Sequence, residues 1–283
     1  QTFVNVSLAE TWEESGDSVD QDMLEHRAED WGDRWPDQVV TVVAGVDVQD
    51  DRLEVELVGV GRDEETWSLE YMVLPGDPSS PQVWADLDAV LFASYETQDG
   101  RELGVRATCI DTGGHHTQAT YRYIKGRESR RVFGIKGVGG EGRPLVGRPS
   151  KNNIGKVRLY PVGSDTAKEL VYGRLKITDP GPGYCHFPDD RDSEYFFQLT
   201  AEQLVTRYVR GHAKRQWVKK RRRNEALDVR CYAMAALYIS GINVNILADK
   251  IADQRIDGGG EKPERKKRPA NSRKSGGFVN NWR

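Results

Sequence analysis

The stretch Val39–Val60 reads VVTVVAGVDVQDDRLEVELVGV, and it decides the fold of this chain. Its first part, residues 39–46, is a nearly continuous run of apolar and β-branched side chains, which is typical of a strand buried on both faces. Residues 53–57 alternate between aliphatic side chains and glutamates, which predicts a strand with one face in solvent. The polar residues 49–51 between the two strands predict a hairpin turn.

Asp47 stands at the end of the first predicted strand. A carboxylate in that position costs free energy to desolvate unless a positive charge neutralises it, so Asp47 is a candidate metal ligand. The other interpretation is that Asp47 only caps the turn beside Asp50 and Asp51. The hairpin by itself fits both roles equally well.

The composition indicates a folded domain with polar extensions. The chain has 283 residues, of which 37% are apolar, and its mean hydropathy is −0.68, which predicts one large domain with loops or tails. The net charge of −3 conceals a strong asymmetry. The first forty residues are rich in acids, whereas residues 207–223 and 261–274 are mostly basic. Charge that is segregated in this way indicates a polyanionic partner at the basic end.

The cysteines and the hydropathy pattern bear on the compartment. Cys109, Cys185 and Cys231 are far apart, odd in number and in no CxxC spacing, which indicates a reducing compartment and argues against a disulfide framework or a zinc site. No signal peptide is visible, and the apolar stretch at residues 233–247 is interrupted by polar residues and too short to span a bilayer. We therefore expect a soluble, cytoplasmic protein. Because the chain begins with Gln1, we also expect a fragment or a processed piece.

Beyond the hairpin, the pattern predicts an α/β fold with a mixed sheet flanked by helices. A third strand at residues 65–74 completes a three-strand antiparallel meander. Residues 105–135 then predict a β-α-β unit with parallel strands, whose first strand ends in Asp111. Asp47 and Asp111 would lie at the carboxyl ends of two strands in the same sheet. Two short strands within residues 175–187 predict a small β insertion.

Residues 203–223 are a strongly basic segment with the aromatic side chains of Tyr208 and Trp217 interleaved. A run of charges is often only a solvated face, but this density beside aromatic residues favours contact with phosphates. The candidate DNA-binding residues are Arg207, Arg210, Lys214, Arg215, Lys219, Lys220, Arg221, Arg222 and Arg223.

The glycine-rich loop at residues 137–142 formally matches the GxGxxG pattern of dinucleotide-binding proteins. Such a fingerprint must open a helix, and Pro144 and Pro149 forbid a helix here. The sequence also contains no GxxxxGK[ST] motif. We therefore predict no nucleotide site in this chain, and we interpret the segment as a flexible loop or as a loop that contacts the substrate.

An amphipathic helix at residues 225–239 carries Asp228 in its first turns, where a carboxylate also suits the helix dipole. If this helix packs across the predicted sheet, it brings Asp228 to the edge that holds Asp47 and Asp111. Converging carboxylates repel one another unless divalent cations lie between them. Hard oxygen ligands suit Mg²⁺ or Mn²⁺, and two such ions about 4 Å apart support hydrolysis of a phosphodiester bond.

Several motifs occur in order along the chain: FVN at 3–5 with the acids after it, AGVDVQDDR at 44–52, CIDTGG at 109–114, GSDTAK at 163–168 and NEALD at 224–228. Together they resemble the nuclease region of the lambda-type phage terminase large subunit, a member of the ribonuclease H-like superfamily, and the first of them resembles the junction that follows the packaging ATPase of that family. The resemblance covers roughly residues 1–245 and implies an endonuclease that cuts concatemeric double-stranded viral DNA during genome packaging.

The resemblance also implies roles and partners. By position, Asp47, Asp111 and Asp228 match the metal-binding catalytic carboxylates. Four further residues are weaker candidates for supporting roles. These are Asp165 as an outer ligand, Lys168 as a phosphate contact, Glu225 as an extra carboxylate and His115 as a proton shuttle. The implied partners are double-stranded DNA, the small terminase subunit, the portal and a packaging ATPase region whose motifs this chain lacks, in the cytoplasm of the host cell.

We therefore predict three regions: an acidic junction at residues 1–38, a ribonuclease H-like nuclease domain at 39–245 and a flexible basic tail at 246–283 that is disordered in isolation. Two alternatives stay open. One is a resolvase or transposase core with the same metal chemistry, and the other is a non-catalytic module that binds DNA or docks on the portal.

Overall fold

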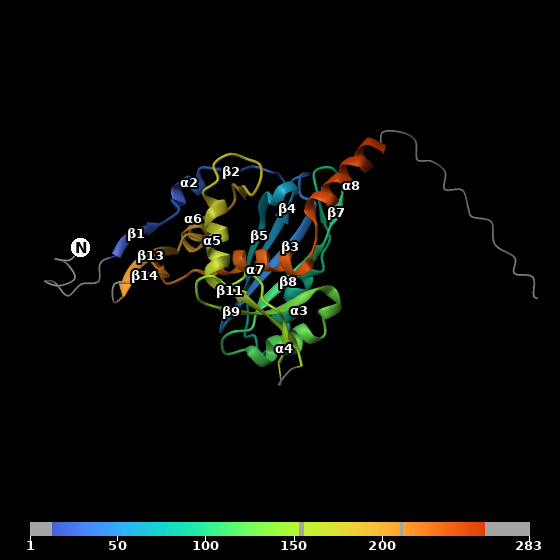
Figure 1. Ribbon diagram of the computed structural model, residues 1–283. Coiled ribbons are helices and arrows are strands. Elements are labelled where there is room, and N and C mark those ends of the chain that lie inside the picture. The colour runs from blue at the N-terminus through green and yellow to red at the C-terminus, as the bar shows by residue number, and fades with distance from the viewer. Residues whose placement is uncertain (1–12, 153–155, 210–211, 258–283) are drawn as a thin grey trace, which may run out of the picture.

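The computed structural model describes residues 13–152, 156–209 and 212–257, and their core is a nine-stranded mixed sheet (Figure 1). β3, β4 and β5 form the predicted antiparallel meander, and β8, β9 and β11 continue the sheet parallel to β3. The predicted mixed α/β sheet is therefore confirmed. Its strands, in spatial order, are β10 (Ser150–Lys151), β11 (Arg158–Gly163), β9 (Val132–Val138), β8 (Val105–Asp111), β3 (Thr41–Val48), β4 (Arg52–Val60), β5 (Thr66–Pro75), β12 (Cys185–Pro188) and β2 (Ala28–Glu29).

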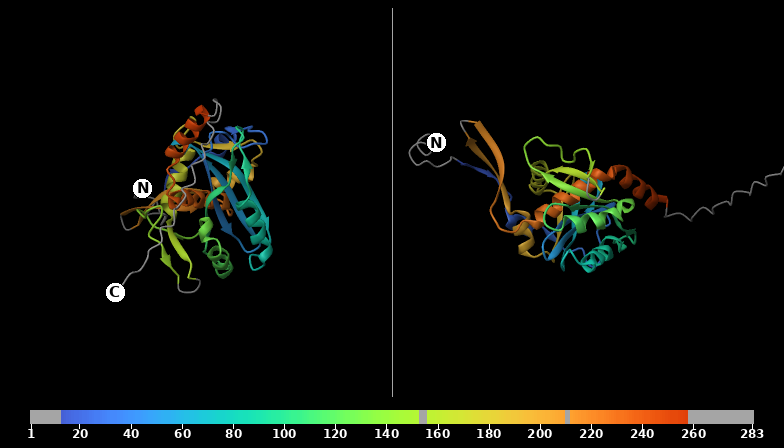
Figure 2. Two further views of the ribbon diagram at one scale, coloured as in Figure 1. Left: turned by 90° about the vertical axis from the view of Figure 1, so that its right-hand side faces the viewer. Right: turned by 90° about the horizontal axis from the view of Figure 1, so that it is seen from below.

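Helices cover both faces of this sheet (Figure 2). α3 and α4 pack on one face, and α5, α6 and α7 pack on the other. No single helix in the described part of the chain is long and apolar enough to cross a membrane, although α7 and α8 satisfy the length and composition criteria jointly, as a pair bent by 78°. The helices and 3₁₀ turns are α2 (Gln21–Glu25), η1 (Arg62–Glu64), α3 (Pro81–Leu91), α4 (Thr117–Lys125), η2 (Glu128–Arg130), α5 (Ser164–Leu175), α6 (Ser193–Leu199), α7 (Glu225–Ser240) and α8 (Val244–Asp257).

The side chains of β3 alternate between the two faces of the sheet, as the period of a strand requires. Val42 and Val46 pack with the residues of α3 and α4, whereas Val43 packs with those of α5 and α7. This is the strand buried on both faces that the apolar run predicts. By the same alternation, Gly45 and Asp47 face α7.

The basic segment forms a hairpin that projects from the body of the molecule (Figure 2). β13 (Glu202–Val209) pairs antiparallel with β14 (His212–Lys219), and β1 (Glu13–Asp17) pairs with the other edge of β13. A second small sheet joins β6 (Tyr95–Glu96) to β7 (Glu102–Leu103). The hairpin leads directly into α7, so the basic strands and the candidate helix of the site are continuous in the chain.

Two predicted features differ from the structure. Of the two short strands predicted within residues 175–187, only the second forms, as β12, and it joins the main sheet between β5 and β2. The predicted tail begins at residue 246, but residues 246–257 belong to α8. Asn243 caps this helix, since its side-chain oxygen accepts the backbone N–H of Ile246 (3.1 Å). The tail after Asp257 lies outside the described residues.

The described part of the acidic junction is docked on the domain. Leu24 is fully buried, and Trp35 stacks on Tyr95 with 4.2 Å between ring centroids. These contacts agree with a connector that is anchored by a few apolar side chains. The boundary at residue 38 stays a prediction.

Candidate active site

Asp47, Asp111 and Asp228 meet on the face of the sheet that α7 covers. The first two lie near the ends of the adjacent parallel strands β3 and β8. Cys109 packs with the α7 side of the core, so Asp111, two residues later, faces the same side as Asp47. Asp228 is in the first turns of α7. The period of the strands therefore directs both strand carboxylates toward the helix that carries the third.

A glycine lets α7 approach the sheet at this point. A Cβ at Gly45 would lie 1.9 Å from the backbone oxygen of Val229, so no other residue fits without moving the helix. Val229 follows Asp228, and Gly45 precedes Asp47 by two residues on the same face. The close contact thus places the carboxylate of α7 next to that of β3.

The three aspartates line a single cavity of about 780 Å³. Its wall combines this carboxylate cluster with several cationic side chains, which is a combination suited to a metal ion and a polyanion together. The remaining lining residues are Gln49, Arg52, Val73, Lys219, Arg222, Arg223, Asn224, Glu225 and Tyr232.

Burial raises the pKa of all three carboxyls, and repulsion by neighbouring carboxylates raises those of Asp47 and Asp228 further. The pKa of Asp47 rises from 3.8 to about 7, chiefly because the group is buried and then because Asp228 repels it; a hydrogen bond from Gln49 Nε2 (2.5 Å) opposes the rise. The pKa of Asp228 rises to about 6, again mainly through burial, while the charge of Lys168 lowers it. Burial also raises the pKa of Asp111, against hydrogen bonds from the backbone.

The chemistry of this donor set suits a divalent cation, because hard oxygen ligands carry the negative charge that such an ion needs. The nearby cations Arg52, Lys168 and Arg223 pair with glutamates instead of with the aspartates. Within the described residues, no group of three or more His, Cys, Asp or Glu side chains is already arranged to hold a metal ion.

A chain of hydrogen bonds supports Asp228. Asn224 Nδ2 donates to Asp228 Oδ2 (3.0 Å) and to Glu202 Oε1 (2.8 Å). Lys168 Nζ donates to both oxygens of Glu202, at 2.8 Å each, and Lys219 Nζ donates to Asn224 Oδ1 (2.6 Å). The structure therefore brings the predicted supporting residue Lys168 to the site, with its ammonium group paired to Glu202.

The other predicted supporting residues lie differently. Glu225 lines the cavity, but its carboxylate accepts hydrogen bonds from two arginines. His115 is exposed, with its Nδ1 3.0 Å from the carboxylate of Asp50. Asp165 accepts the backbone N–H of Gly140 (3.0 Å). Neither His115 nor Asp165 belongs to the described wall of the cavity.

Sequence reasoning missed Tyr232, which lines the cavity with the three aspartates. It lies one helical turn after Asp228 on α7, on the same face. Burial raises the pKa of its hydroxyl, and the charges of Asp228, Asp111 and Asp47 raise it further. The spacing of four residues from Asp228 is the signal that could have identified it.

The prediction of a solvent-exposed face on β4 was wrong. Glu54 and Glu56 are both fully buried. Arg230 of α7 donates to both oxygens of Glu56 (3.0 and 2.6 Å), and the hydroxyl of Tyr195 donates to it as well (2.7 Å). The partners are far away in sequence, so the alternating pattern on β4 could not reveal that its charges are neutralised inside the protein.

The predicted DNA-binding residues divide into two groups. Lys219, Arg222 and Arg223 line the cavity beside the aspartates. Arg207, Lys214 and Arg215 lie on the hairpin strands β13 and β14, and Arg215 lies 3.5 Å from Glu169 of α5. Arg221 lies in the loop before α7, over the ring of Phe197. The predicted residues that the structure describes outside the cavity wall are Arg207, Lys214, Arg215, Lys220 and Arg221, while Arg210 lies outside the described residues.

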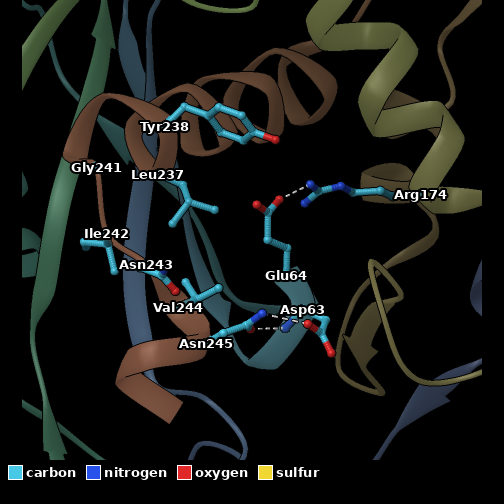
Figure 3. A pocket seen from close by; sticks show the side chains of 10 residues that line it. All are labelled: Asp63, Glu64, Arg174, Leu237, Tyr238, Gly241, Ile242, Asn243, Val244 and Asn245. Carbon is cyan, nitrogen blue, oxygen red and sulfur yellow. Dashed lines mark hydrogen bonds and ion pairs between the residues drawn. The ribbon is translucent and has the colours of Figure 1, made fainter. Parts of the chain in front are cut away.

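A second cavity, of about 640 Å³, lies at the other end of β3 and β4, between η1 and the junction of α7 and α8 (Figure 3). Its acids are paired, since Glu64 forms an ion pair with Arg174 and Asn245 Nδ2 donates to Asp63 Oδ1 (2.8 Å). The described wall of this cavity therefore lacks the clustered carboxylates that distinguish the first.

Comparison with known proteins identifies the family of the chain. The family model described as the endonuclease domain of the terminase large subunit gpA matches residues 1–250, so this chain belongs to that family. It is 38% identical over 248 residues to the terminase large subunit of Escherichia phage lambda and 36% identical over 252 residues to that of Enterobacteria phage P21. Each match covers 85% of this chain, but only 39% of the length of the relative. The predicted family is confirmed.

Two solved structures of a mutant nuclease domain of the large terminase subunit gp2 of bacterial virus Sf6 are also similar, one with manganese and β-thujaplicinol and one with manganese. Their TM-scores are 0.46 and 0.45, with 12% and 13% sequence identity. Each match covers 76% of this chain and 97% of that chain.

Proposed function

We propose that this chain is a metal-dependent endonuclease that cuts concatemeric double-stranded viral DNA during genome packaging, with Asp47, Asp111 and Asp228 as its catalytic carboxylates. The observation that carries the proposal is the convergence of these three side chains, from β3, β8 and α7, on one cavity in which their pKa values are raised. Membership of the endonuclease-domain family supports the class of reaction.

Asp47, Asp111 and Asp228 would hold two divalent cations, Mg²⁺ or Mn²⁺. When bound, such cations supply the positive charge that activates a water for attack on a phosphodiester and stabilises the leaving oxygen. The protein orients the carboxylates by hydrogen bonds, from Gln49 to Asp47 and from Asn224 to Asp228. Each hydrogen bond uses one carboxylate oxygen and leaves the other available.

The cationic side chains at the cavity would hold the DNA backbone. Lys219, Arg222 and Arg223 stand on the wall that carries the aspartates, so a strand that they bind passes the carboxylates. The hairpin formed by β13 and β14 would extend this contact along the duplex by charge attraction, which carries no sequence preference.

The larger assembly is inferred from the family. The chain spans 39% of the length of its relatives, and we propose that a packaging ATPase region, the small terminase subunit and the portal act with it in the cytoplasm of the infected host cell. The ATPase region would move the DNA, and this chain would cut it.

Cleavage of supercoiled plasmid by the purified chain, with Mg²⁺, Mn²⁺ or EDTA, tests the proposal. We expect metal-dependent nicking and linearisation that Asp47→Asn, Asp111→Asn and Asp228→Asn each abolish, while the matched control Asp249→Asn, in an exposed ion pair with Arg62, retains it. DNA binding without cleavage under any metal would instead support a non-catalytic DNA-binding module.

A further inference from the structure

Two arginines and two glutamates form a closed ring of ion pairs on the wall of the cavity. Glu54 Oε1 accepts Arg52 Nε (2.6 Å) and Arg223 Nη2 (2.7 Å). Glu225 closes the ring, since its Oε1 accepts Arg52 Nη2 (3.1 Å) and its Oε2 accepts Arg223 Nε (3.3 Å). The ring links the start of β4 to the start of α7, and its four formal charges sum to zero.

The ring is anchored from below. Glu54 is fully buried, and its second oxygen accepts the hydroxyl of Tyr71. A buried carboxylate that loses its partners keeps the whole cost of desolvation, so neither arginine can leave the ring cheaply. Arg52 and Arg223 are therefore held in fixed orientations before any ligand arrives, which reduces the entropy lost on binding.

The outer amino groups of both arginines have weaker partners. Arg52 Nη1 donates to Asp51, whose side chain is 78% exposed (2.7 Å). Arg223 Nη1 lies 3.9 Å from Glu194, which is 53% exposed. Exposed ion pairs contribute little free energy, so an incoming phosphate can replace these acids while the ring stays intact.

We propose that Arg52 and Arg223 form a clamp for the phosphates of the DNA strand beside the carboxylate cluster, and that Glu54 and Glu225 are positioning residues that orient this clamp. The inference rests on the proposed nuclease function. Both arginines line the cavity that contains the three aspartates, and the outer amino group of each guanidinium, Nη1, can donate to a phosphate oxygen while the other nitrogens stay in the ring. Glu225 thus serves the arginines rather than the metal.

The salt dependence of DNA binding separates a phosphate contact from a purely structural ring. The affinity of the full chain for a short DNA duplex would be measured by fluorescence anisotropy, with EDTA, over a range of salt concentrations. We expect the double variant Arg52→Gln/Arg223→Gln to bind about tenfold more weakly and to show a slope of log K against log salt that is shallower by about 2, because each phosphate contact contributes about 0.9.

The matched control is Arg62→Gln, since Arg62 is an arginine that also forms an ion pair, with Asp249, but it is exposed and lies outside this cavity. We expect the control to keep the wild-type slope. A wild-type slope in the folded double variant would overturn the clamp, because a ring that only joins β4 to α7 makes no phosphate contact to lose.

Conservative variants keep the test decisive if the double variant does not fold. Arg52→Lys and Arg223→Lys keep the charge but not the two-pronged geometry, so we expect an unchanged salt slope and a KM for plasmid cleavage raised about fivefold each. Glu54→Gln should raise KM in the same way, since it leaves both arginines without their shared anchor. An unchanged KM in all three folded variants would contradict the clamp.

The proposed nuclease function fails separately. If the wild-type protein cuts no DNA with any metal, but the double variant shows a shallower slope of log K against log salt, the clamp stands and the nuclease proposal fails. If wild-type protein cuts DNA and the slope is unchanged, the nuclease proposal stands and the clamp fails.

Discussion

Two groups of carboxylates under α7 differ in how the protein treats their charge. Every carboxylate oxygen of Glu54 and Glu56 accepts a hydrogen bond from an arginine or a tyrosine. Asp47, Asp111 and Asp228 receive bonds only from amide groups among the described residues, and their pKa values rise. The first group is complete without a ligand, whereas the second has no ion-pair partner among the described residues, which fits the proposed metal site.

The contrast is sharp because Asp47 and Glu54 are directly opposite each other in the pairing of β3 with β4. Like charges at facing positions of a sheet are destabilising, so each of these two carboxylates must be offset by a stabilising interaction or serve a function. For Glu54 the offset is structural, since two arginines neutralise it. For Asp47, the neighbouring helix α7 brings another carboxylate, Asp228, instead of a cation. We therefore expect Asp47 to serve the function of the site and not its stability.

The largest effect is expected when the unpaired group loses a member. Asp47→Asn should lower metal-dependent plasmid cleavage by about a thousandfold or more, since groups that act as one catalytic unit fail together. The double variant Asp47→Asn/Asp228→Asn should then cost little more than either single variant. The cleavage rates would be measured under single-turnover conditions. A loss in the double variant equal to the product of the two single losses would show that the aspartates act independently.

Removing a member of the paired group should act on stability instead. Glu56→Gln leaves the buried guanidinium of Arg230 without its countercharge, which should lower the free energy of unfolding by about 3–5 kcal/mol. Urea denaturation measures this change, and the folded fraction should keep its metal-dependent cleavage. If cleavage per folded molecule disappeared, the two groups would not be functionally distinct.

The unpaired group also predicts a pH dependence of stability. The pKa of Asp47 is about 7 in the folded chain. Between about pH 4 and pH 7, Asp47 therefore stays protonated in the folded chain but is ionised in the unfolded chain. Because the folded chain binds the extra proton, the free energy of unfolding falls as pH rises. The decrease should reach a few kcal/mol, at about 1.4 kcal/mol per unit of pKa shift. Thermal unfolding without metal should show it, and Asp47→Asn should flatten the curve. A wild-type curve that is flat over this range would contradict the uncompensated charge.

The smallest effect concerns α7, which carries Asp228 of the unpaired group and Arg230, the partner of Glu56 in the paired group. Gly45→Ala pushes a methyl group against the backbone at Val229 and should cost about 1–3 kcal/mol as an overpacked contact. The shift should separate Asp228 from Asp47 and raise the metal concentration needed for cleavage. In the matched variant Gly173→Ala, at a helical glycine, an added Cβ meets no atom within 4 Å beyond its chain neighbours and the backbone of its own helix. This variant should not lower the stability, since alanine favours a helix, and should leave the metal concentration needed for cleavage unchanged.

The sequence predicted the features that depend on the period of the apolar residues and on the residues at the ends of strands. The meander, the parallel strands and the meeting of Asp47, Asp111 and Asp228 follow from apolar runs that end in carboxylates. The burial of Glu54 did not follow, because the arginines that neutralise it come from other segments and long-range pairs leave no periodic signal. The same limit applies to the arginine ring, in which Arg52 and Arg223 meet only in the folded chain.

The most direct test of the account is a calorimetric titration of Mn²⁺ into the metal-free chain near pH 8, which is above the pKa of about 7 for Asp47 and of about 6 for Asp228. The account predicts saturable binding in the wild type, and in Glu56→Gln while it is folded, but no binding in Asp47→Asn/Asp228→Asn. Equal binding in wild type and Asp47→Asn/Asp228→Asn would contradict the claim that the unpaired carboxylates are the metal site.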